Sequence, residues 1–290
     1  MNVTVRDDRI FPSTRRVAVV VVAVLLAASL TLYLWPDETE RLFAWTIRPR
    51  MTPLVMGAGY FAGAFLFACV LASRRWHEVG LAFLPIGVFT AFMAVATILH
   101  WDRFNHGHVW FWMWVALYAV TPFLLPILWL RNRVTDPGTL EPDDARLPRP
   151  IRAVLALAGL VELAIGLFLF LWPEAAMRIW PWTLTPLTAR VTGGWFALPG
   201  VSALLMACDG RWSASRVVVL AGAVLAALIL VGIARAWGDF DPSNPLTWVY
   251  AALIALTLLG FGALYLGMEA YRRRRRAANR NALVTLDRRD

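Results

Sequence analysis

The sequence predicts an all-α fold, a polytopic transmembrane helical bundle of eight helices arranged as two parallel four-helix repeats. The first observation behind this prediction is composition: 59% of the 290 residues are hydrophobic and the mean hydropathy is +0.60, more than soluble domains carry. The second is that apolar residues gather in runs of about 20, the length that crosses a bilayer core. The third is an internal repeat. Because a lipid-exposed backbone must satisfy its own hydrogen bonds, each run is expected to be a helix.

The apolar runs give the order of the elements. The eight expected spans cover residues 17–35, 53–72, 79–99, 110–130, 153–172, 190–208, 217–236 and 248–270. They are flanked by an N-terminal tail at 1–16 and a basic C-terminal tail at 271–290. The linker at 131–152 holds four prolines and a cluster of acidic residues, which excludes a buried helix and separates the first repeat (17–130) from the second (153–270).

The repeat can be followed residue by residue. At an offset of 137, Leu34-Trp35-Pro36, Arg41, Trp45 and Pro49 return as Leu171-Trp172-Pro173, Arg178, Trp182 and Pro186. After one deletion the offset is 136, and Gly57, Trp101 and Trp112 return as Gly193, Trp237 and Trp248. Each copy holds four spans, an even number, so both copies are expected to run in the same direction through the membrane.

The arginines predict the orientation. All 28 basic residues are arginines, and placing both termini inside puts 21 of them on the cytoplasmic side and 7 near the outer ends. The positive-inside rule therefore predicts a multi-pass protein of the cytoplasmic (inner) membrane with N-in and C-in topology. The formal charge of +9 follows from this topology, so no nucleic-acid partner is inferred, and membrane lipids are the expected partners.

Aromatic residues crowd the expected outer face. Twelve of the 15 tryptophans lie at or near it. They either anchor the outer ends of the helices in the interface or wall a cavity for a lipid or another flat apolar ligand. The outer loops at 36–52 and 173–189 both begin with Trp-Pro and an acidic residue, followed by Arg, a large apolar residue and Trp at helical spacing. This pattern predicts a short amphipathic helix lying in the interface.

Glu162 is the first candidate for a ligand-binding residue. It lies near the middle of the fifth span, where an ionisable group costs several kcal/mol unless it is paired or hydrated. Gly159 and Gly166 lie on the same side of the helix, and small residues mark a face that packs on another helix, so Glu162 is expected to point into the bundle. Its counterpart in the first repeat is Leu25. The alternative is a neutral, hydrogen-bonded carboxyl that only joins two helices.

Four arginines form the second group of candidates. Arg190 and Arg235 sit at outer helix ends, and Arg48 and Arg50 lie in the first outer loop. Guanidinium groups bind phosphate and carboxylate in a bidentate manner, so this group is able to hold an anionic head group. The alternative is neutralisation by the seven acidic residues at the same end.

Catalytic and metal-binding motifs are weak or missing from the sequence. His100, His106 and His108 lie close together with Asp102, but the spacing is not a strong metal signature and the second copy has no histidine. The sequence contains no Walker loop, dinucleotide-binding glycine pattern, Gly-x-Ser-x-Gly or His-Glu-x-x-His motif. No catalytic residue, metal or cofactor is assigned, and an enzymatic role is not favoured.

One segment resembles a family signature. Its residues are Trp180-Pro181-Trp182-Thr183-Leu184-Thr185-Pro186-Leu187-Thr188-Ala189-Arg190, continuing to Gly193-Gly194-Trp195. This segment is similar to a signature of uncharacterised eight-span bacterial integral membrane proteins, a family that brings no assigned activity. The first copy departs from it, so the resemblance implies that any site made by the motif lies in the second repeat, with Trp182 and Trp195 as its aromatic candidates.

Two functions follow from these observations. The first is binding or carrying a lipid-like, apolar or anionic small molecule near the outer leaflet, which rests on the outer aromatic residues, Glu162 and the outer arginines. The second is a non-catalytic accessory or scaffold subunit with a protein partner in a membrane complex, which the short loops and the lack of a soluble domain favour.

Overall fold

The computed structural model describes residues 6–141 and 144–287, and eight helices within them are long and apolar enough to cross a membrane. These helices confirm the predicted all-α, multi-pass membrane protein. Their bounds are α1 Pro12–Leu34, α3 Met51–Ala72, α4 Phe83–Leu99, α5 Val109–Asn132, α6 Arg149–Leu171, α8 Pro186–Asp209, α9 Trp212–Arg235 and α10 Pro245–Asp287. The predicted tails and linker extend to 1–5, 142–143 and 288–290, which lie outside the described residues.

Several helices begin before the apolar run from which they were predicted. Proline stands at the first helical position of α1, α8 and α10. A residue there needs no hydrogen-bonding N–H, and the fixed φ of proline already suits a helix. At the other end of α8, Gly210 takes the left-handed conformation (φ 72°) that closes many helices. The last helix, in contrast, continues beyond residue 270, so the predicted basic tail extends α10 as far as Asp287.

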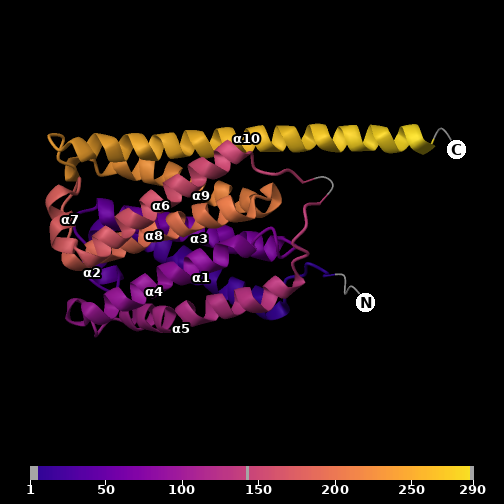
Figure 1. Ribbon diagram of the computed structural model, residues 1–290. Coiled ribbons are helices and arrows are strands. Elements are labelled where there is room, and N and C mark those ends of the chain that lie inside the picture. The colour runs from indigo at the N-terminus through magenta and orange to yellow at the C-terminus, as the bar shows by residue number, and fades with distance from the viewer. Residues whose placement is uncertain (1–5, 142–143, 288–290) are drawn as a thin grey trace.

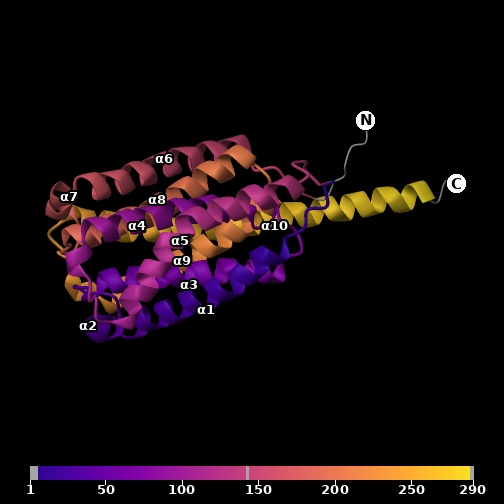
Figure 2. The same ribbon diagram turned by 90° about the horizontal axis from the view of Figure 1, so that it is seen from below.

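The helices pack in pairs, and the middle helices join the two halves of the chain. Helix α1 packs on α3 and α4 on α5 in the first half, while α6 packs on α8 and α9 on α10 in the second. Between the halves, α3 packs on α9 and α8 packs on α4. The start of α1 and the end of α10 lie at one end of the bundle, which we call the terminal end; the short helices α2 and α7 lie at the opposite loop end (Figures 1 and 2).

The short helices of the loop end are briefer than the sequence predicts. The 3₁₀ turn η1 (Pro36–Glu38) and helix α2 (Thr39–Leu42) end before Trp45, and α7 covers Pro173–Ile179. Phe43 is extended (ψ 177°), which turns the following residues inward, and Trp45 is only 3% exposed. The prediction that Trp45 lies on an interfacial helix is therefore wrong, because its ring is taken into the core.

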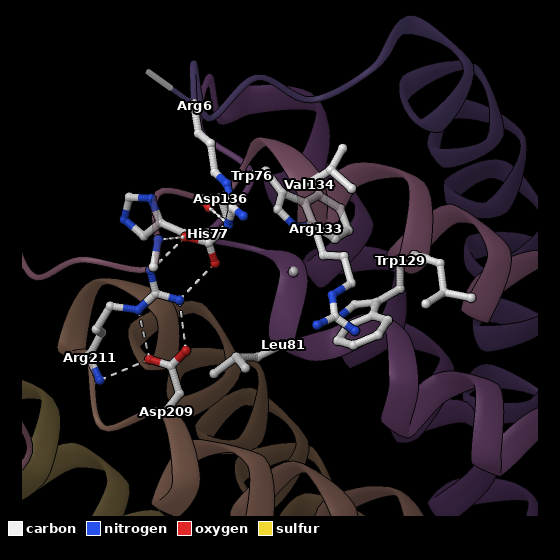
Figure 3. A pocket seen from close by; sticks show the side chains of 13 residues that line it. Arg6, Trp76, His77, Leu81, Trp129, Arg133, Val134, Asp136, Asp209 and Arg211 are labelled. Atoms are coloured by element: carbon white, nitrogen blue, oxygen red, sulfur yellow. Dashed lines mark hydrogen bonds and ion pairs between the residues drawn. The ribbon is translucent and has the colours of Figure 1, made fainter. Parts of the chain in front are cut away.

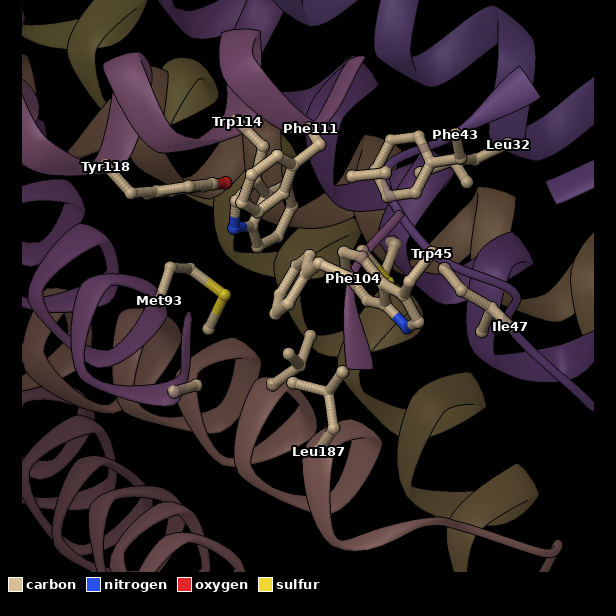
Figure 4. Packing of buried hydrophobic residues seen from close by; sticks show 14 of the residues in the cluster. Leu32, Phe43, Trp45, Ile47, Met93, Phe104, Phe111, Trp114, Tyr118 and Leu187 are labelled. Carbon is tan, nitrogen blue, oxygen red and sulfur yellow. The ribbon is translucent and has the colours of Figure 1, made fainter. Parts of the chain in front are cut away.

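The tryptophans at the loop end divide into two classes. Trp45 and Trp114 are buried with their ring centroids 4.8 Å apart, and they pack with Phe43 and Phe104 in a closed aromatic cluster (Figure 4). A second set remains exposed on the bundle surface, namely Trp35, Trp101, Trp112, Trp172, Trp237 and Trp248. The exposed rings are suited to anchoring the helix ends in the membrane interface. The buried rings fill the space between the helices. From the sequence, these tryptophans are expected to be either interfacial anchors or the walls of a ligand cavity. The sequence does not predict that they divide in this way.

Glycines allow the closest helix contact. The small-residue face predicted on α6 packs on α8, where Gly166 meets Gly193: a Cβ atom added to Gly166 would lie 2.7 Å from the Gly193 carbonyl oxygen. This neighbour is backbone and cannot rotate away. Glycine is therefore required here by the approach of two backbones, as in small-residue interfaces of other membrane helices.

We expect Gly166→Ala to destabilise the bundle by about 1–3 kcal/mol, the usual cost of inserting a methyl group into a packed contact. The matched control is Gly262→Ala on α10, where an added Cβ meets nothing within 4 Å. The control should be neutral or slightly stabilising, since alanine favours helix by up to about 1 kcal/mol over glycine. Thermal unfolding midpoints in one detergent measure both variants. Equal shifts would show that the α6–α8 contact is looser than described.

Candidate functional site

The terminal end is built from two extended segments that pair with loops. Residues 6–11, which we call the N-terminal strap, precede α1 and bridge to the loop between α3 and α4 at Arg75. Residues 144–147, the second strap, precede α6 and bridge to the loop between α8 and α9 at Arg211. Each strap therefore fastens the start of one helix to the loop that leads into another.

A carboxylate secures each strap. Asp8 accepts a hydrogen bond from the His77 backbone N–H at 3.0 Å and pairs with the His77 ring through Nδ1. In the second strap Asp144 accepts from the Ser213 backbone N–H at 3.0 Å and from the Ser213 hydroxyl at 2.6 Å. The His77 side chain is only 4% exposed. Burial alone lowers the pKa of His77, but the hydrogen bond and negative charge of Asp8 outweigh it, so the pKa lies above its ordinary value.

Arg211 joins the linker to the loop between α8 and α9. Its guanidinium donates to both Asp136 oxygens at 2.8 Å and also to Asp209 at 2.7–2.9 Å. Half-burial raises the pKa of Asp136, but the hydrogen bonds and charge of Arg211 outweigh it, and the net pKa is lowered. The two hydrogen-bonded carboxylates raise the pKa of Arg211 in turn. The three side chains are therefore held as a charged network, which suits the planar fork of arginine.

A cavity of about 590 Å³ lies among these groups. Figure 3 shows its side chains converging from the strap, the α3–α4 loop, the end of α5 and the α8–α9 loop. It is lined by Arg6, Trp76, His77, Gly80, Leu81, Trp129, Leu130, Arg133, Val134, Asp136, Gly138, Asp209 and Arg211. A volume of this size matches common small-molecule sites, which combine apolar walls with a few polar groups.

Two of the cavity's guanidinium groups have no carboxylate partner within the described residues. Arg133 lies over the Trp129 ring, 4.5 Å from its centroid, and Arg6 donates to the Asp136 backbone carbonyl at 2.9 Å. Arg211, in contrast, is neutralised by Asp136 and Asp209. The cavity therefore carries unpaired positive charge beside two indole rings, and its chemistry favours an anion attached to an apolar group.

Glu162 lies away from this cavity. It is half-buried on α6, a helix that packs mainly on α8, and it forms no hydrogen bond or ion pair with the described residues. The glycine face of α6 meets α8 through Gly159 and Gly166, and Glu162 lies beside that contact. Within the described residues Glu162 thus has no partner charge, and it lines neither the 590 Å³ cavity nor the 60 Å³ cavity.

The four candidate arginines at the loop end do not gather in one site. Arg48 and Arg50 are exposed and both pair with Asp37, Arg50 at 2.8 Å. Arg235 donates to the Tyr33 carbonyl at 2.7 Å and stacks on its ring. Arg190 contacts the His100 ring nitrogen at 2.7 Å, and its Nε is buried without a partner in the described chain. Burial and the charges of Arg190 and Arg103 lower the pKa of His100, which favours a neutral ring that accepts this bond.

The two tryptophans of the sequence motif, Trp182 and Trp195, pack against other side chains of the protein. Trp182 donates to the Thr52 hydroxyl at 2.9 Å. Trp195 covers Gly59 and contacts Phe89, with ring centroids 4.3 Å apart. Trp195 also lines a small apolar cavity of about 60 Å³ inside the bundle, beside hydrogen-bonded Tyr60 and Tyr118. That volume is far below the roughly 300 Å³ at which small-molecule pockets begin, so it is too small for a lipid-like ligand.

The histidines of the 100–108 segment serve separate contacts. His106 bonds the Trp101 carbonyl and His108 bonds the Arg41 carbonyl, at 3.0 and 2.8 Å. In the part of the chain that the structure describes, no group of three His, Cys, Asp or Glu residues is arranged to hold a metal ion.

Sequence reasoning overlooked the residues that line the large cavity. In the sequence, Arg6, Arg133 and Arg211 indicate only the membrane topology. Trp76 and Trp129 carried a usable signal, since they belong to the small minority of tryptophans away from the crowded loop end. Their convergence depends on loops that are far apart in sequence, which no local pattern reveals.

Arg211→Ala should lower the stability of the protein by about 2–3 kcal/mol, because it leaves two carboxylates without their shared cation. We expect a smaller loss of stability than for a fully buried ion pair, because the side chains of Arg211, Asp136 and Asp209 remain 12%, 20% and 16% exposed. The stability of Arg211→Lys should lie between those of the wild type and Arg211→Ala, because an ammonium group cannot bind both carboxylates with the forked geometry of a guanidinium. Arg74→Ala, an exposed cation at the same end, is the control, and thermal unfolding in detergent provides the measurement. An alanine effect no larger than that of the control would contradict the network.

No protein-family model, curated protein or solved structure matches the chain.

Proposed function

We propose that the protein binds an anionic amphiphile, with its acidic head group in the cavity of the terminal end. The observation that carries this proposal is a 590 Å³ cavity with two guanidinium groups, Arg6 and Arg133, that no carboxylate neutralises within the described residues. Such groups bind phosphate and carboxylate through strong, charge-assisted hydrogen bonds.

The cavity also offers apolar contact. Trp76 and Trp129 supply aromatic walls. Leu130 and Val134, at the α5 side, are 53% and 60% exposed on the surface that is expected to face lipid. A ligand with a charged head and an apolar chain matches both features, because the chain is able to follow α5 while the head stays among the arginines. A lipid head group and a free phosphate-bearing or carboxylate-bearing molecule share this chemistry.

The contacts of the arginines favour a head-group site at the terminal end over one in the outer leaflet. Arg48, Arg50 and Arg235 already bind Asp37 or a backbone carbonyl. If the topology is N-in and C-in, as the arginine distribution predicts, the cavity faces the cytoplasmic leaflet, where acidic lipids attract basic side chains.

We further infer that the bundle consists of two parallel repeats. Equivalent contacts recur in both halves: Arg15 of α1 donates to the Leu71 and Ser73 carbonyls beside the end of α3, and Arg152 of α6 donates to those of Ala207 and Cys208 in the last turn of α8. The helix pairs recur in the same order. These likenesses support a duplicated scaffold. The cavity wall that α5 forms belongs to the first half.

A second candidate function is an accessory subunit in a membrane complex. It is favoured by α10, which packs mainly on α9 and whose most apolar stretch has no buried residue. A lipid-facing helix has the same exposure, so this observation carries less weight than a cavity with unpaired charges.

Arg133→Gln should weaken binding of an acidic phospholipid by about ten- to hundredfold, the effect of losing a charge-assisted hydrogen bond. Native mass spectrometry of the protein in mild detergent, titrated with phosphatidic acid, measures the bound fraction. Arg131→Gln is the matched control: it removes the same charge two residues away, from an exposed position that does not line the cavity.

Other arms of the experiment separate the ligands and the sites. Phosphatidylcholine tests the need for a net negative head group, and inorganic phosphate tests whether the anion binds without a chain. Arg190→Ala and Glu162→Gln should retain binding because neither residue lines the cavity. Equal loss in Arg131→Gln and Arg133→Gln would contradict a specific site, and loss confined to Arg190→Ala would move the site to the loop end.

A further inference from the structure

The N-terminal strap holds the two sides of the cavity together. The Asp8 backbone N–H donates to the Thr135 carbonyl at 2.9 Å, beside the end of α5. On its other side the Asp8 carbonyl accepts from the Trp76 N–H at 2.7 Å, in the α3–α4 loop. Thr135 and Trp76 adjoin or form the cavity wall, so the position of Asp8 decides how these two walls meet.

The strap also carries Arg6 to the cavity. Arg6 lies two residues before Asp8 and bonds the Asp136 carbonyl at 2.9 Å (Figure 3). If the strap leaves the loop, the cavity loses one of its two unpaired guanidinium groups. Docking of the strap and capture of an anion are therefore linked through Arg6.

Asp8 is held in a strained conformation by its side-chain contacts. Its φ is 53°, in the left-handed region that costs a non-glycine residue about 1 kcal/mol. The carboxylate balances this cost, because one oxygen accepts the His77 N–H and the other meets the His77 ring. Such strain persists only where the surroundings over-determine it, and here one of the contacts that hold Asp8 comes from an ionisable ring.

We propose that Asp8 and His77 form a pH-sensitive latch that keeps the strap and Arg6 docked, so that anion binding in this cavity weakens when His77 loses its proton. The inference rests on the proposed function of the cavity and adds its regulation.

Charge explains the direction of the switch. The charged groups facing His77 are Asp8, Glu78, Asp136 and Arg211. Because Asp8 outweighs burial and Arg211, the His77 pKa is raised, so the charged pair is fully formed below the ordinary value of 6.5. Its contribution to docking is lost as the pH rises through the raised value. The latch is therefore closed in mild acid and weakened in mild alkali.

The same chain contains a strap without the switch. In the second strap Ser213 stands where His77 stands in the first, and its hydroxyl bonds Asp144 at 2.6 Å. The neighbouring Trp212 N–H bonds the Ala145 carbonyl at 2.9 Å, as Trp76 bonds Asp8. Serine does not titrate in this range. A histidine is thus unnecessary for fastening a strap, and its presence adds sensitivity to protons.

Hydrogen–deuterium exchange of the full-length protein in detergent tests the latch without any ligand. Peptides covering 6–11 and 74–80 report the first strap, and peptides covering 144–148 and 210–214 report the second in the same molecule. Between about pH 6 and about pH 9, after correction for intrinsic chemistry, protection of the first strap should fall by roughly three- to tenfold relative to the second. His77→Ser should abolish this difference. An equal pH response of both straps in the wild type would overturn the latch even if the variant does not fold.

A binding arm tests the coupling. Phosphatidic acid titrated across the same pH range should bind the wild type about three- to tenfold more weakly at the alkaline end, while His77→Ser should follow only the ionisation of the lipid itself. Binding that is equal in both proteins while the strap opens would overturn the coupling. No binding at any pH would overturn the proposed function of the cavity, and the exchange experiment would still decide whether the latch exists.

Discussion

The packing of α3 on α9 and of α8 on α4 is the contact on which the rest of the bundle depends. These helices join the halves of the chain, and α3 and α8 are the most buried of the eight spans, with 67% and 56% of their apolar stretches inside. Every remaining helix packs onto this centre from outside and turns an apolar face outward. Apart from Glu162, the bundle therefore places its charged groups at or near its two ends, because the middle offers few partners for them.

The two ends solve this problem differently. At the loop end, rings such as Trp45 and Trp114 fold inward and close the space between helices. At the terminal end, Trp76 and Trp212 are also buried, and hydrogen bonds and ion pairs fasten the straps to the neighbouring loops. A cavity lies at this end, and its charged lining includes Arg6, Arg133 and Arg211.

The sequence was sufficient for the helices and insufficient for the cavity. Runs of apolar residues located all eight spans, because crossing a bilayer demands length and hydrophobicity that composition reveals directly. The glycine contact of α6 also followed from a local pattern. The fate of Trp45 did not, since an inward turn after Leu42 overrides helical spacing. Arg6, His77 and Arg133 come from three separate segments, and only tertiary structure unites them.

Glu162 and His77 show why an ionisable residue needs its surroundings before it has a meaning. Glu162 attracted attention by its depth, yet the described chain supplies it with neither a partner nor a cavity. His77 lies in a loop that no hydropathy profile marks, yet it meets a carboxylate, a strained backbone and a cavity wall at one point. A change of protonation affects function only where the change of charge strengthens or weakens another contact. By that criterion we favour the strap at the terminal end, rather than the membrane-embedded carboxyl, as the place where the proposed anionic ligand and protons act on the same contacts.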